Sequence, residues 1–328
     1  MGSCLSHTNV TKLEIAIKFP NGLNYQYYSN GWKSDHDINN FISKLYFEKP
    51  SSKNKWTNWI VYNNQVLSQQ SPQQQVNNNH LVENNSGHCK GILAWRYKKN
   101  RVKYSWLIHS IPNFPTYFSE TSISTIQKPQ ERYGQSLVYV KGEHSDINVL
   151  IDQLMLMKPN IISYNCGNTN KISPTVLFPK NLTFTKLSND IEHIAKAPQF
   201  NVDIYDILAC KYGYDCYVET WLHGTNDNIM PETPAIRHVK YIKTDTCEFK
   251  ESQDHSKWAI SANTANTANT TNATEKCFLN ICCSKSDKWI FIGDLNRMNS
   301  QKHRGGGGIL IFNNKKLWKA FHDIIYII

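Results

Sequence analysis

The sequence of 328 residues has no Cys-x-x-Cys pair, and its nine cysteines are an odd number. This pattern argues against a zinc ribbon, a thioredoxin-type site and a disulfide framework. No apolar run approaches the length of a membrane-spanning helix. The N-terminus also lacks the apolar stretch of a signal peptide, so both the cytoplasm and an acidic compartment remain open as locations.

The sequence also has little that predicts a metal site. It has no cluster of carboxylates of the kind that magnesium-dependent nucleases use. Cys282 and Cys283 are adjacent, but no acceptable ligand spacing accompanies them. We therefore expect neither a metal ion nor an organic cofactor.

What the chain does have is positive charge. Its 36 basic residues outnumber 26 acidic ones, which gives a formal net charge of +10. Such a balance favours polyanionic partners, with nucleic acid first and anionic membrane surfaces second. The N-terminal "MGSCLS" fits an N-myristoylation pattern, but short patterns of this kind occur by chance, and we do not expect membrane association by lipidation. A homodimer is compatible with the sequence.

The pattern of apolar residues predicts a mixture of strands and helices. Five segments are typical of strands: "KLEIAIKF", "NWIVYNN", "GILAWRY", "KYSWLIHSI" and "SLVYVKG". Helical spacing appears in "SDINVLIDQLMLMKP", which Ser145 or Asp146 can cap, and in "KKLWKAFHDIIYII", where Leu317, Phe321, Ile324 and Ile325 share a face. The fold class is therefore α/β or mixed α+β.

Two segments are unusual in composition. Residues 63–79 are polar and of low complexity, which indicates a surface loop. Residues 263–274 nearly repeat small polar residues that cannot pack in a core, so we interpret them as an insertion. A boundary between an N-terminal half (1–160) and a C-terminal half (161–328) is predicted near residues 156–175.

Three His-x-Lys tripeptides occur, where a random arrangement gives about one. They are His88–Lys90, His238–Lys240 and His255–Lys257. On a strand, residues i and i+2 point to the same side, so the imidazole and the ammonium lie together. This arrangement suits phosphodiester chemistry, because lysine neutralises phosphate oxygens while imidazole attacks phosphorus or donates a proton.

Two of the three tripeptides are followed by similar polar residues. After His255 come Asp294 and Asn296, just past the strand "KWIFI". After His88 come His109 and Asn113. The third tripeptide has no such sequel, so His238 and Lys240 are predicted to be ordinary strand residues. Four further residues are candidates for phosphate or DNA contacts: Trp258, Arg297, His303 and Arg304.

Seven strings together resemble the deoxyribonuclease II family, in that family's order, from about residue 12 to residue 323. They are "GHCKGIL", "WLIHSIPNFP", "RYGQSLVYV", "KYGYDCYVETWL", "DHSKWAI", "GDLNRMNSQKHRGGGG" and "LWKAF". The resemblance implies a phospholipase-D-like fold, in which two similar halves related by a pseudo-two-fold axis each give one His-x-Lys to a shared cleft. It also implies metal-independent endonucleolytic cutting of double-stranded DNA at acidic pH, with little sequence preference, leaving 3′-phosphate ends.

The resemblance assigns roles by position. His88, Lys90, His255, Lys257 and Asn296 are expected to be catalytic. Three residues are expected to support them: His109, Asn113 and Asp294. The chain departs from the family in its lack of a signal peptide, in the insertion at 263–274, and in having Tyr139, Ala259, Phe291 and Ile311 where animal members carry disulfide cysteines.

Three hypotheses follow. The first is a deoxyribonuclease II-like endonuclease with one histidine as nucleophile and the other as general acid. The second is a catalytically inactive DNA-binding relative, because the insertion could spoil the cleft. The third is a phospholipase-D-like enzyme that acts on lipid phosphodiesters. The net positive charge favours the first two, and the sequence leaves open which histidine is the nucleophile.

Overall fold

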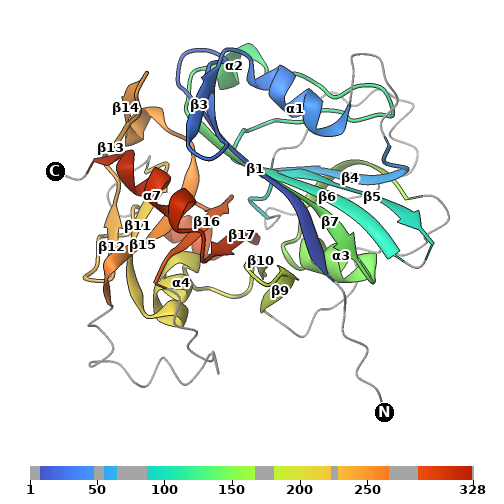
Figure 1. Ribbon diagram of the computed structural model, residues 1–328. Coiled ribbons are helices and arrows are strands. Elements are labelled where there is room, and N and C mark those ends of the chain that lie inside the picture. Colours follow the sequence, from blue (N-terminus) through green and yellow to red (C-terminus); the bar gives the residue numbers. More distant parts are fainter. Residues whose placement is uncertain are drawn as a thin grey trace.

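The computed structural model describes residues 8–47, 55–64, 87–99, 101–166, 181–222, 228–265 and 287–326. Strands in these ranges form an eight-stranded, a seven-stranded and a three-stranded sheet. Helices accompany both large sheets, so the predicted mixed α/β class is confirmed. In Figure 1 the first large sheet (blue to green) lies to the right of the second (yellow to red).

The first sheet is built from the N-terminal half of the chain, and all five predicted strands belong to it. In lateral order its strands are β3 (Trp32–Asp35), β2 (Tyr25–Tyr28), β1 (Asn9–Lys18), β7 (Gln135–His144), β6 (Arg101–His109), β5 (Gly91–Lys98), β4 (Asn58–Asn63) and β8 (Asn160–Asn165). The last of these strands passes the predicted boundary at residue 160, and the division into two domains remains a prediction.

The second sheet uses residues from 182 onward. In lateral order its strands are β12 (Ile236–His238), β11 (Tyr214–Thr220), β15 (Lys257–Ala265), β16 (Trp289–Gly293), β17 (Gly306–Phe312), β10 (Ile191–Lys196) and β9 (Leu182–Ser188). The small sheet joins β14 (Glu248–Lys250), β13 (Tyr241–Lys243) and β18 (Ile325–Tyr326). Lys240 lies between β12 and β13, so its assignment to a strand is wrong, whereas His238 ends β12.

The two large sheets share one topology. Strands β1, β4, β5, β6 and β7 have the lateral order β1-β7-β6-β5-β4, and all their neighbouring pairs are antiparallel. Strands β10, β11, β15, β16 and β17 repeat this chain order, lateral order and antiparallel pairing. The start of β5 in one sheet therefore corresponds to the start of β15 in the other.

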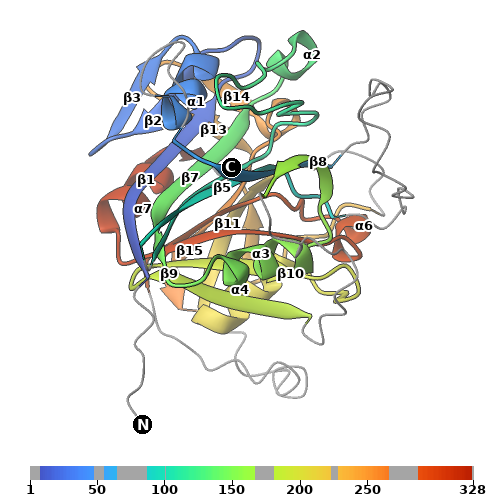
Figure 2. The ribbon, with the colours of Figure 1, turned by 90° about the vertical axis from the view of Figure 1, so that its right-hand side faces the viewer.

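Helices α1 (Ile38–Tyr46) and α4 (Ile204–Tyr212) cover the outer faces of the sheets, and Figure 2 shows them above and below the two layers of strands. The inner faces share one core with α3 (Ile147–Leu156) and α7 (Lys315–Asp323). Alternation sorts the strand residues between these layers. On β5, Ile92 and Ala94 pack in the outer cluster, whereas Leu93 and Trp95 pack in the inner one.

The helices agree with the sequence predictions except at the C-terminus. The Asp146 side chain caps α3 by accepting from the amide of Asn148, as expected. Helix α7, by contrast, ends at Asp323, and Ile325 does not share its face. Ile325 pairs with Ile242 in β18 instead, because the exposed edge of β13 offers backbone partners to the chain end. The short helices are α2 (Lys128–Glu131) and α6 (Asn299–Lys302), and residues Glu251–Gln253 form a 3-10 turn.

Several predictions lie outside the described residues. They include most of the polar loop at 63–79, the lipidation pattern, and Cys282 and Cys283. Of the insertion at 263–274, the first three residues continue β15 and the rest is outside the described ranges. In the part of the chain that is described, no helix has the length and apolar character to cross a membrane.

Candidate active site

Two of the three His-x-Lys tripeptides occupy equivalent places in the two large sheets. His88 and Lys90 directly precede β5, and His255 and Lys257 lie at the start of β15. Both histidines are at most 7% exposed, and both lysines are fully buried. His88 contacts Asp294, which belongs to the half that carries His255, and His255 contacts Ser110, which belongs to the half that carries His88, so the two units face a common place.

Each histidine is oriented by a carbonyl group from the opposite half of the chain. His88 Nδ1 lies 2.6 Å from the main-chain oxygen of Asp294, which follows β16. His255 Nδ1 lies 3.0 Å from the main-chain oxygen of Ser110, which follows β6. A carbonyl oxygen only accepts hydrogen bonds, so Nδ1 carries the proton in both rings. Each Nε2 is then available for chemistry.

The lysine and histidine side chains lie in direct contact in the second half-site. Lys257 Nζ lies 3.0 Å from His255 Nδ1 and donates to the main-chain oxygen of His255. Nδ1 has a single in-plane position, which the bond to the Ser110 oxygen takes, so we interpret the contact with Lys257 as electrostatic. In the first half-site, Lys90 Nζ donates to the His88 oxygen over 3.2 Å.

The main chain of each histidine is also fixed by the other half. The His88 amide donates to the oxygen of Gly305 over 2.7 Å, and the His255 amide donates to that of Gly134 over 2.8 Å. These glycines precede the equivalent strands β17 and β7. A Cβ atom at Gly305 would lie 2.0 Å from the main-chain oxygen of Met157, so no larger residue fits there.

Behind these glycines, two buried lysines fix the loops that carry them. Lys18 at the end of β1 donates to the oxygens of Phe19, Gly22 and Glu131 over 2.8 to 2.9 Å. Lys196 at the end of β10 donates to the oxygens of Phe200 and Lys302 over 3.0 and 2.7 Å. Glu131 and Lys302 each lie three residues before the supporting glycine, so the two arrangements are equivalent.

The electrostatics of the site favour an anion. Burial, followed by the nearby lysine charges, lowers the pKa of His88 and of His255 well below the usual value. Burial lowers the pKa of Lys90 to about 8, and burial and then the charge of Lys90 lower that of Lys257. The two histidines and two lysines can all carry positive charge, and they repel one another because the site is buried away from water. A phosphate anion bound between them would relieve this repulsion.

The predicted supporting residues lie beside these groups. Asp294 accepts the amide of Gly307 through Oδ1 over 2.9 Å, and burial raises its pKa to about 7. Its Oδ2 and the Oδ1 of Asn296 are buried without hydrogen-bond partners. His109 is fully buried, accepts the amide of Ile111 through Nδ1, and leaves Nε2 without a partner. Burial and then Lys90 lower its pKa.

Asn113 is placed differently from the others. It is partly exposed, and its φ of 53° lies in the left-handed region that asparagine tolerates well. This conformation indicates a role in the turn that follows β6. Its support of catalysis remains a prediction.

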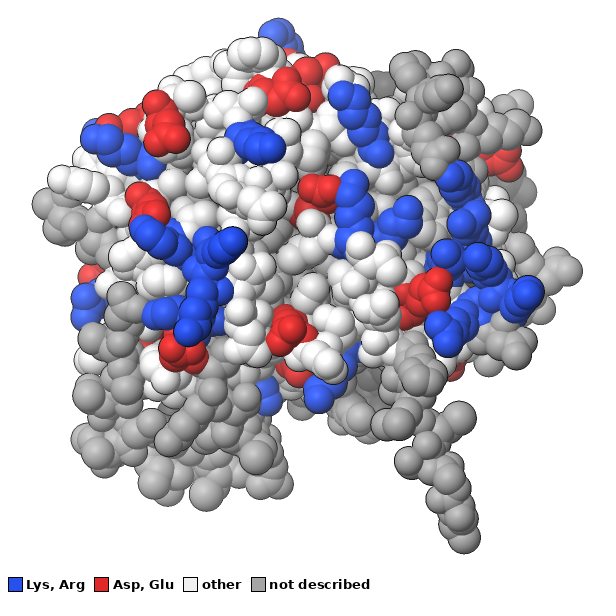
Figure 3. Space-filling model, viewed as in Figure 1, with Lys and Arg blue, Asp and Glu red and all other residues white. Residues whose placement is uncertain are grey.

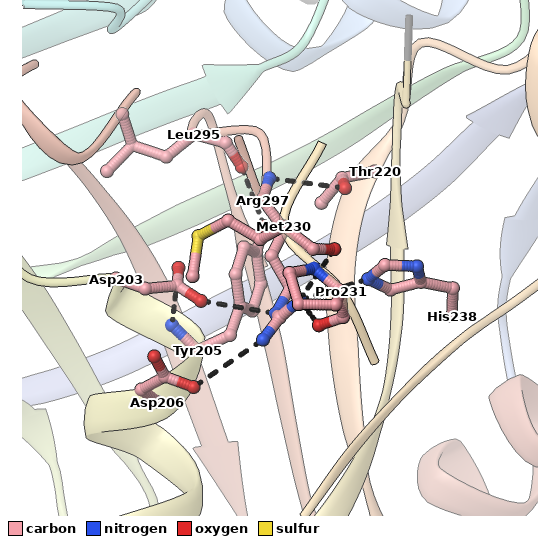
Figure 4. A network of polar contacts seen from close by, with 9 residues as sticks. All are labelled: Asp203, Tyr205, Asp206, Thr220, Met230, Pro231, His238, Leu295 and Arg297. Atoms are coloured by element: carbon pink, nitrogen blue, oxygen red, sulfur yellow. Dashed lines mark hydrogen bonds and ion pairs between the residues drawn. The ribbon is translucent and has the colours of Figure 1, made fainter. Parts of the chain in front are cut away.

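Two predicted DNA-binding residues belong to the protein interior, which corrects the sequence interpretation. Arg297 is 1% exposed, and its Nε lies 3.2 Å from Asp203. Its remaining nitrogens contact Asp206, the main-chain oxygens of Met230 and Pro231, and His238 Nε2 (Figure 4). The guanidinium nitrogens therefore interact with protein groups, and not with a phosphate of DNA.

Trp258 is the second correction. It is fully buried, with its ring edge-on to Phe321 of α7 at 5.0 Å between centroids, so it cannot stack on DNA. Arg304 and His303, by contrast, are not part of the interior: His303 is exposed, and Arg304 is half-buried beside His88, donating to the oxygen of Gly87 over 3.0 Å. The third tripeptide is separate from the site, because the His238 side chain contacts Arg297.

The structure adds residues that the sequence did not single out. Ser110 supplies the oxygen for His255, and its Oγ accepts the amide of Ser136 and donates to Gln135. Ser136 Oγ accepts the amide of Lys257. Glu219 on β11 is fully buried with both carboxylate oxygens unpartnered, and burial raises its pKa. The strand "YDCYVET" holds two acids, Asp215 and Glu219, so the sequence alone has no signal that singles out Glu219.

Metal ligands do not gather at this site or elsewhere in the described ranges. Within them, no three His, Cys, Asp or Glu side chains are grouped so that they could hold a metal ion. The cations that surround the site are lysine, arginine and histidine side chains.

These features define a protein with two topologically equivalent sheets, each of which delivers a buried His-x-Lys unit to one common place. The chain belongs to the deoxyribonuclease II family, whose model matches residues 15–328. It is 29% identical over 262 residues to deoxyribonuclease-2-beta of Mus musculus (73% of this chain, 64% of that protein). Against cell-death-related nuclease 7 of Caenorhabditis elegans it is 27% identical over 259 residues (73% and 62%).

The match therefore spans less than two thirds of those two relatives. Deoxyribonuclease-2-beta of Rattus norvegicus is matched more fully, at 27% identity over 336 residues, 93% of this chain and 83% of that protein. The resemblance inferred from the seven sequence strings is thereby confirmed.

Proposed function

We propose that the protein is a metal-independent endonuclease that hydrolyses DNA phosphodiester bonds in acid and leaves 3′-phosphate ends. One observation carries the proposal: two buried histidines, each with Nδ1 on a carbonyl from the opposite half, present two Nε2 atoms to one cationic place. Family membership supports DNA as the substrate.

The first chemical step uses the two histidines in different protonation states. The neutral imidazole attacks phosphorus through Nε2 and forms a P–N bond while the P–O5′ bond breaks. The protonated partner gives its Nε2 proton to the departing O5′. Lys90 and Lys257 stabilise the negative charge that develops on the non-bridging oxygens.

The second step regenerates the enzyme. The partner histidine, now neutral, accepts a proton from water as that water attacks phosphorus. The P–N bond breaks, the phosphate stays on the 3′ carbon, and the nucleophilic histidine leaves as a neutral imidazole. Both histidines end in their starting states, and His88 and His255 are both competent for either role.

The supporting groups have assigned roles in this proposal. Asp294 holds the orientation of His88 through its main-chain oxygen and places a buried carboxyl group near Lys90. Asn296 and His109 each offer a buried, unpartnered polar atom that can bind the phosphate or the attacking water. Arg304 and His303 contact the DNA backbone at the edge of the site.

Positive surface charge extends beyond the site. Figure 3 shows lysine and arginine side chains gathered on the right of this face, where Figure 1 places the far ends of β5 and β6. Lys98, Lys99 and Arg101 line a hollow there together with Glu143. The length of β5 puts this group roughly 25 Å from Lys90, so it can attract DNA without touching the scissile phosphate.

The deciding experiment is to incubate supercoiled plasmid with the protein at about pH 5 and excess EDTA. We expect nicking and linearisation, with ends that a polymerase extends only after phosphatase treatment. Cutting that EDTA abolishes and magnesium restores would contradict the proposal. Binding of plasmid without cutting would identify an inactive DNA-binding relative, and release of choline from phosphatidylcholine instead would identify a lipid phosphodiesterase. Homodimer formation stays a prediction.

A further inference from the structure

The two half-sites differ at positions that the shared topology makes equivalent. Gly134 and Gly305 are counterparts, because each accepts a histidine amide and precedes an equivalent strand. The residues directly before them are Tyr133 and Arg304. The second half-site therefore has an aromatic ring where the first has a guanidinium.

A second pair of counterparts follows from the strand register. Tyr62 lies opposite Gly91, and Glu219 lies opposite Trp258, in each case three residues after the histidine. Two residues further along the chain, just past the ends of β4 and β11, come Asn64 and Trp221. The second half-site again has an aromatic ring where the first has a small polar side chain.

The two aromatic rings of the second half-site lie together against its histidine. The ring centroids of Trp221 and His255 are 4.4 Å apart, and those of Tyr133 and Trp221 are 5.3 Å apart. Both rings are partly exposed, whereas His255 is 3% exposed. The Arg132 guanidinium carbon lies 5.3 Å from the centroid of Tyr133. The rings thus form an accessible aromatic wall at the entrance to His255.

The counterparts of these two rings in the first half-site are polar. Arg304 is half-buried there and bonds to the Gly87 oxygen over 3.0 Å, and Asn64 binds the Asn63 side chain through its main-chain amide. A phosphodiester offers two kinds of neighbour to such a site, a charged phosphate and a flat nucleobase. Guanidinium suits the first, and aromatic rings suit the second.

We propose that Tyr133 and Trp221 form a stacking subsite for one nucleobase next to the scissile phosphate, on the His255 side only. Arg304 binds the next phosphate on the His88 side, so the DNA strand crosses the two half-sites in one direction. This inference rests on the proposed nuclease function. Stacking reads the π face that every base has, so it gives affinity without sequence preference and requires the base to leave its own stack.

The test uses short single-stranded oligonucleotides in which one linkage is an ordinary phosphodiester and the others are phosphorothioates, which resist cleavage but keep the negative charge that Arg304 binds. An abasic analogue replaces the nucleotide either on the 5′ or on the 3′ side of that bond. We expect one of the two replacements to lower kcat/KM about tenfold for the wild type, and the other to have much less effect.

Variants then link the effect to the two rings. Trp221→Ala and Tyr133→Ala should each lower kcat/KM on the intact oligonucleotide. On the abasic oligonucleotide to which the wild type is sensitive, the kcat/KM of each variant should differ little from that of the wild type. Trp221→Phe should restore most of the activity, because phenylalanine keeps a stacking face. Arg304→Gln is the matched control from the equivalent position, and its loss should be the same on intact and abasic oligonucleotides.

Two outcomes would overturn the stacking subsite. One is a Trp221→Ala loss of equal size on all three oligonucleotides, which would mean that Trp221 only packs against His255. The other is equal sensitivity of the wild type to both abasic positions. If the wild type cuts no DNA, the proposed function fails, and the fluorescence anisotropy of labelled intact and abasic oligonucleotides decides about the subsite. The stacking subsite is supported if the wild type binds the intact oligonucleotide more tightly than the abasic one and Trp221→Ala binds both equally. It is rejected if the wild type binds both equally.

Discussion

The Nδ1 atom of His255 and the main-chain oxygen of Ser110 lie 3.0 Å apart, although 145 residues separate them in the sequence. The same relation joins His88 to Asp294 in the opposite direction. Each His-x-Lys unit is therefore complete only when the other half is folded against it. The carbonyl groups fix both the ring orientation and the tautomer, which leaves the same nitrogen of each ring for phosphorus.

Replacing either histidine should stop the reaction at its first step. We expect His88→Ala and His255→Ala each to lower kcat by at least about 1000-fold, because nucleophile and general acid are both needed. The thermal midpoint of unfolding should change little. His238→Ala is the control from the third tripeptide. A large loss of activity in His238→Ala with little loss in His255→Ala would mean that His238 is catalytic and His255 is not.

The rate should fall as the pH rises towards neutrality. The pKa values of His88 and His255 are lowered in the free protein by burial and by lysine charge, so a proton on the general acid requires acid conditions. A bound phosphate anion favours the charged imidazolium and raises these pKa values again. The alkaline limb of kcat should therefore lie at higher pH than that of kcat/KM, within a bell centred at about pH 5 to 6.

Single-turnover rates at constant ionic strength, from pH 4 to pH 8, measure this profile. Lys257→Met removes the positive charge that adjoins His255. It should move the alkaline limb of kcat/KM to higher pH while lowering the maximum. A rate that increases steadily through pH 8 would contradict the two-histidine mechanism.

Arg297 should matter for stability and not for DNA contact. Arg297→Met leaves Asp203 buried without its cation, which typically costs about 3 to 5 kcal/mol. We expect a clear fall in the urea midpoint, with kcat/KM per folded molecule nearly unchanged. The comparison is Arg304→Gln, which should change the midpoint little and lower kcat/KM. If Arg297→Met instead lowered kcat/KM and left the urea midpoint unchanged, Arg297 would be a DNA-binding residue.

The basic group at the β5–β6 hairpin should affect association and not chemistry. Lys98→Glu with Lys99→Asn should lower kcat/KM several-fold at low ionic strength and leave kcat unchanged, because distant charges act on encounter. Asparagine suits position 99, where φ is 51°. The difference should disappear as salt screens the charges. A fall in kcat that persists at high salt would place the hairpin in the catalytic complex.

The strands and the two His-x-Lys units could be predicted from the sequence because they depend on local patterns. Strand alternation and the i, i+2 spacing depend only on nearby residues, so β5 and the His88–Lys90 unit could be identified directly. The same alternation could have excluded Trp258: if Lys257 faces the site, its neighbour faces the core. Arg297 was misassigned because its acidic partner Asp203 is almost one hundred residues away in the chain.

The reciprocal contacts could not be predicted at all. The oxygens of Ser110 and Asp294 belong to the main chain, and every residue type supplies the same carbonyl group. Which carbonyl meets which imidazole depends on how the two sheets pack. The end of α7 was missed for a related reason, since the edge of β13 that captures Ile325 comes from a distant segment.

The bonds of Lys18 and Lys196 have a consequence for how the protein loses activity. Each lysine holds a loop of its own half, and that loop holds the histidine of the other half. A small separation of the two sheets would break both histidine supports together while leaving each sheet internally paired. Such local openings need less free energy than global unfolding. Inactivation should thus be a reversible event that precedes denaturation, visible as early hydrogen exchange at the amides of His88 and His255.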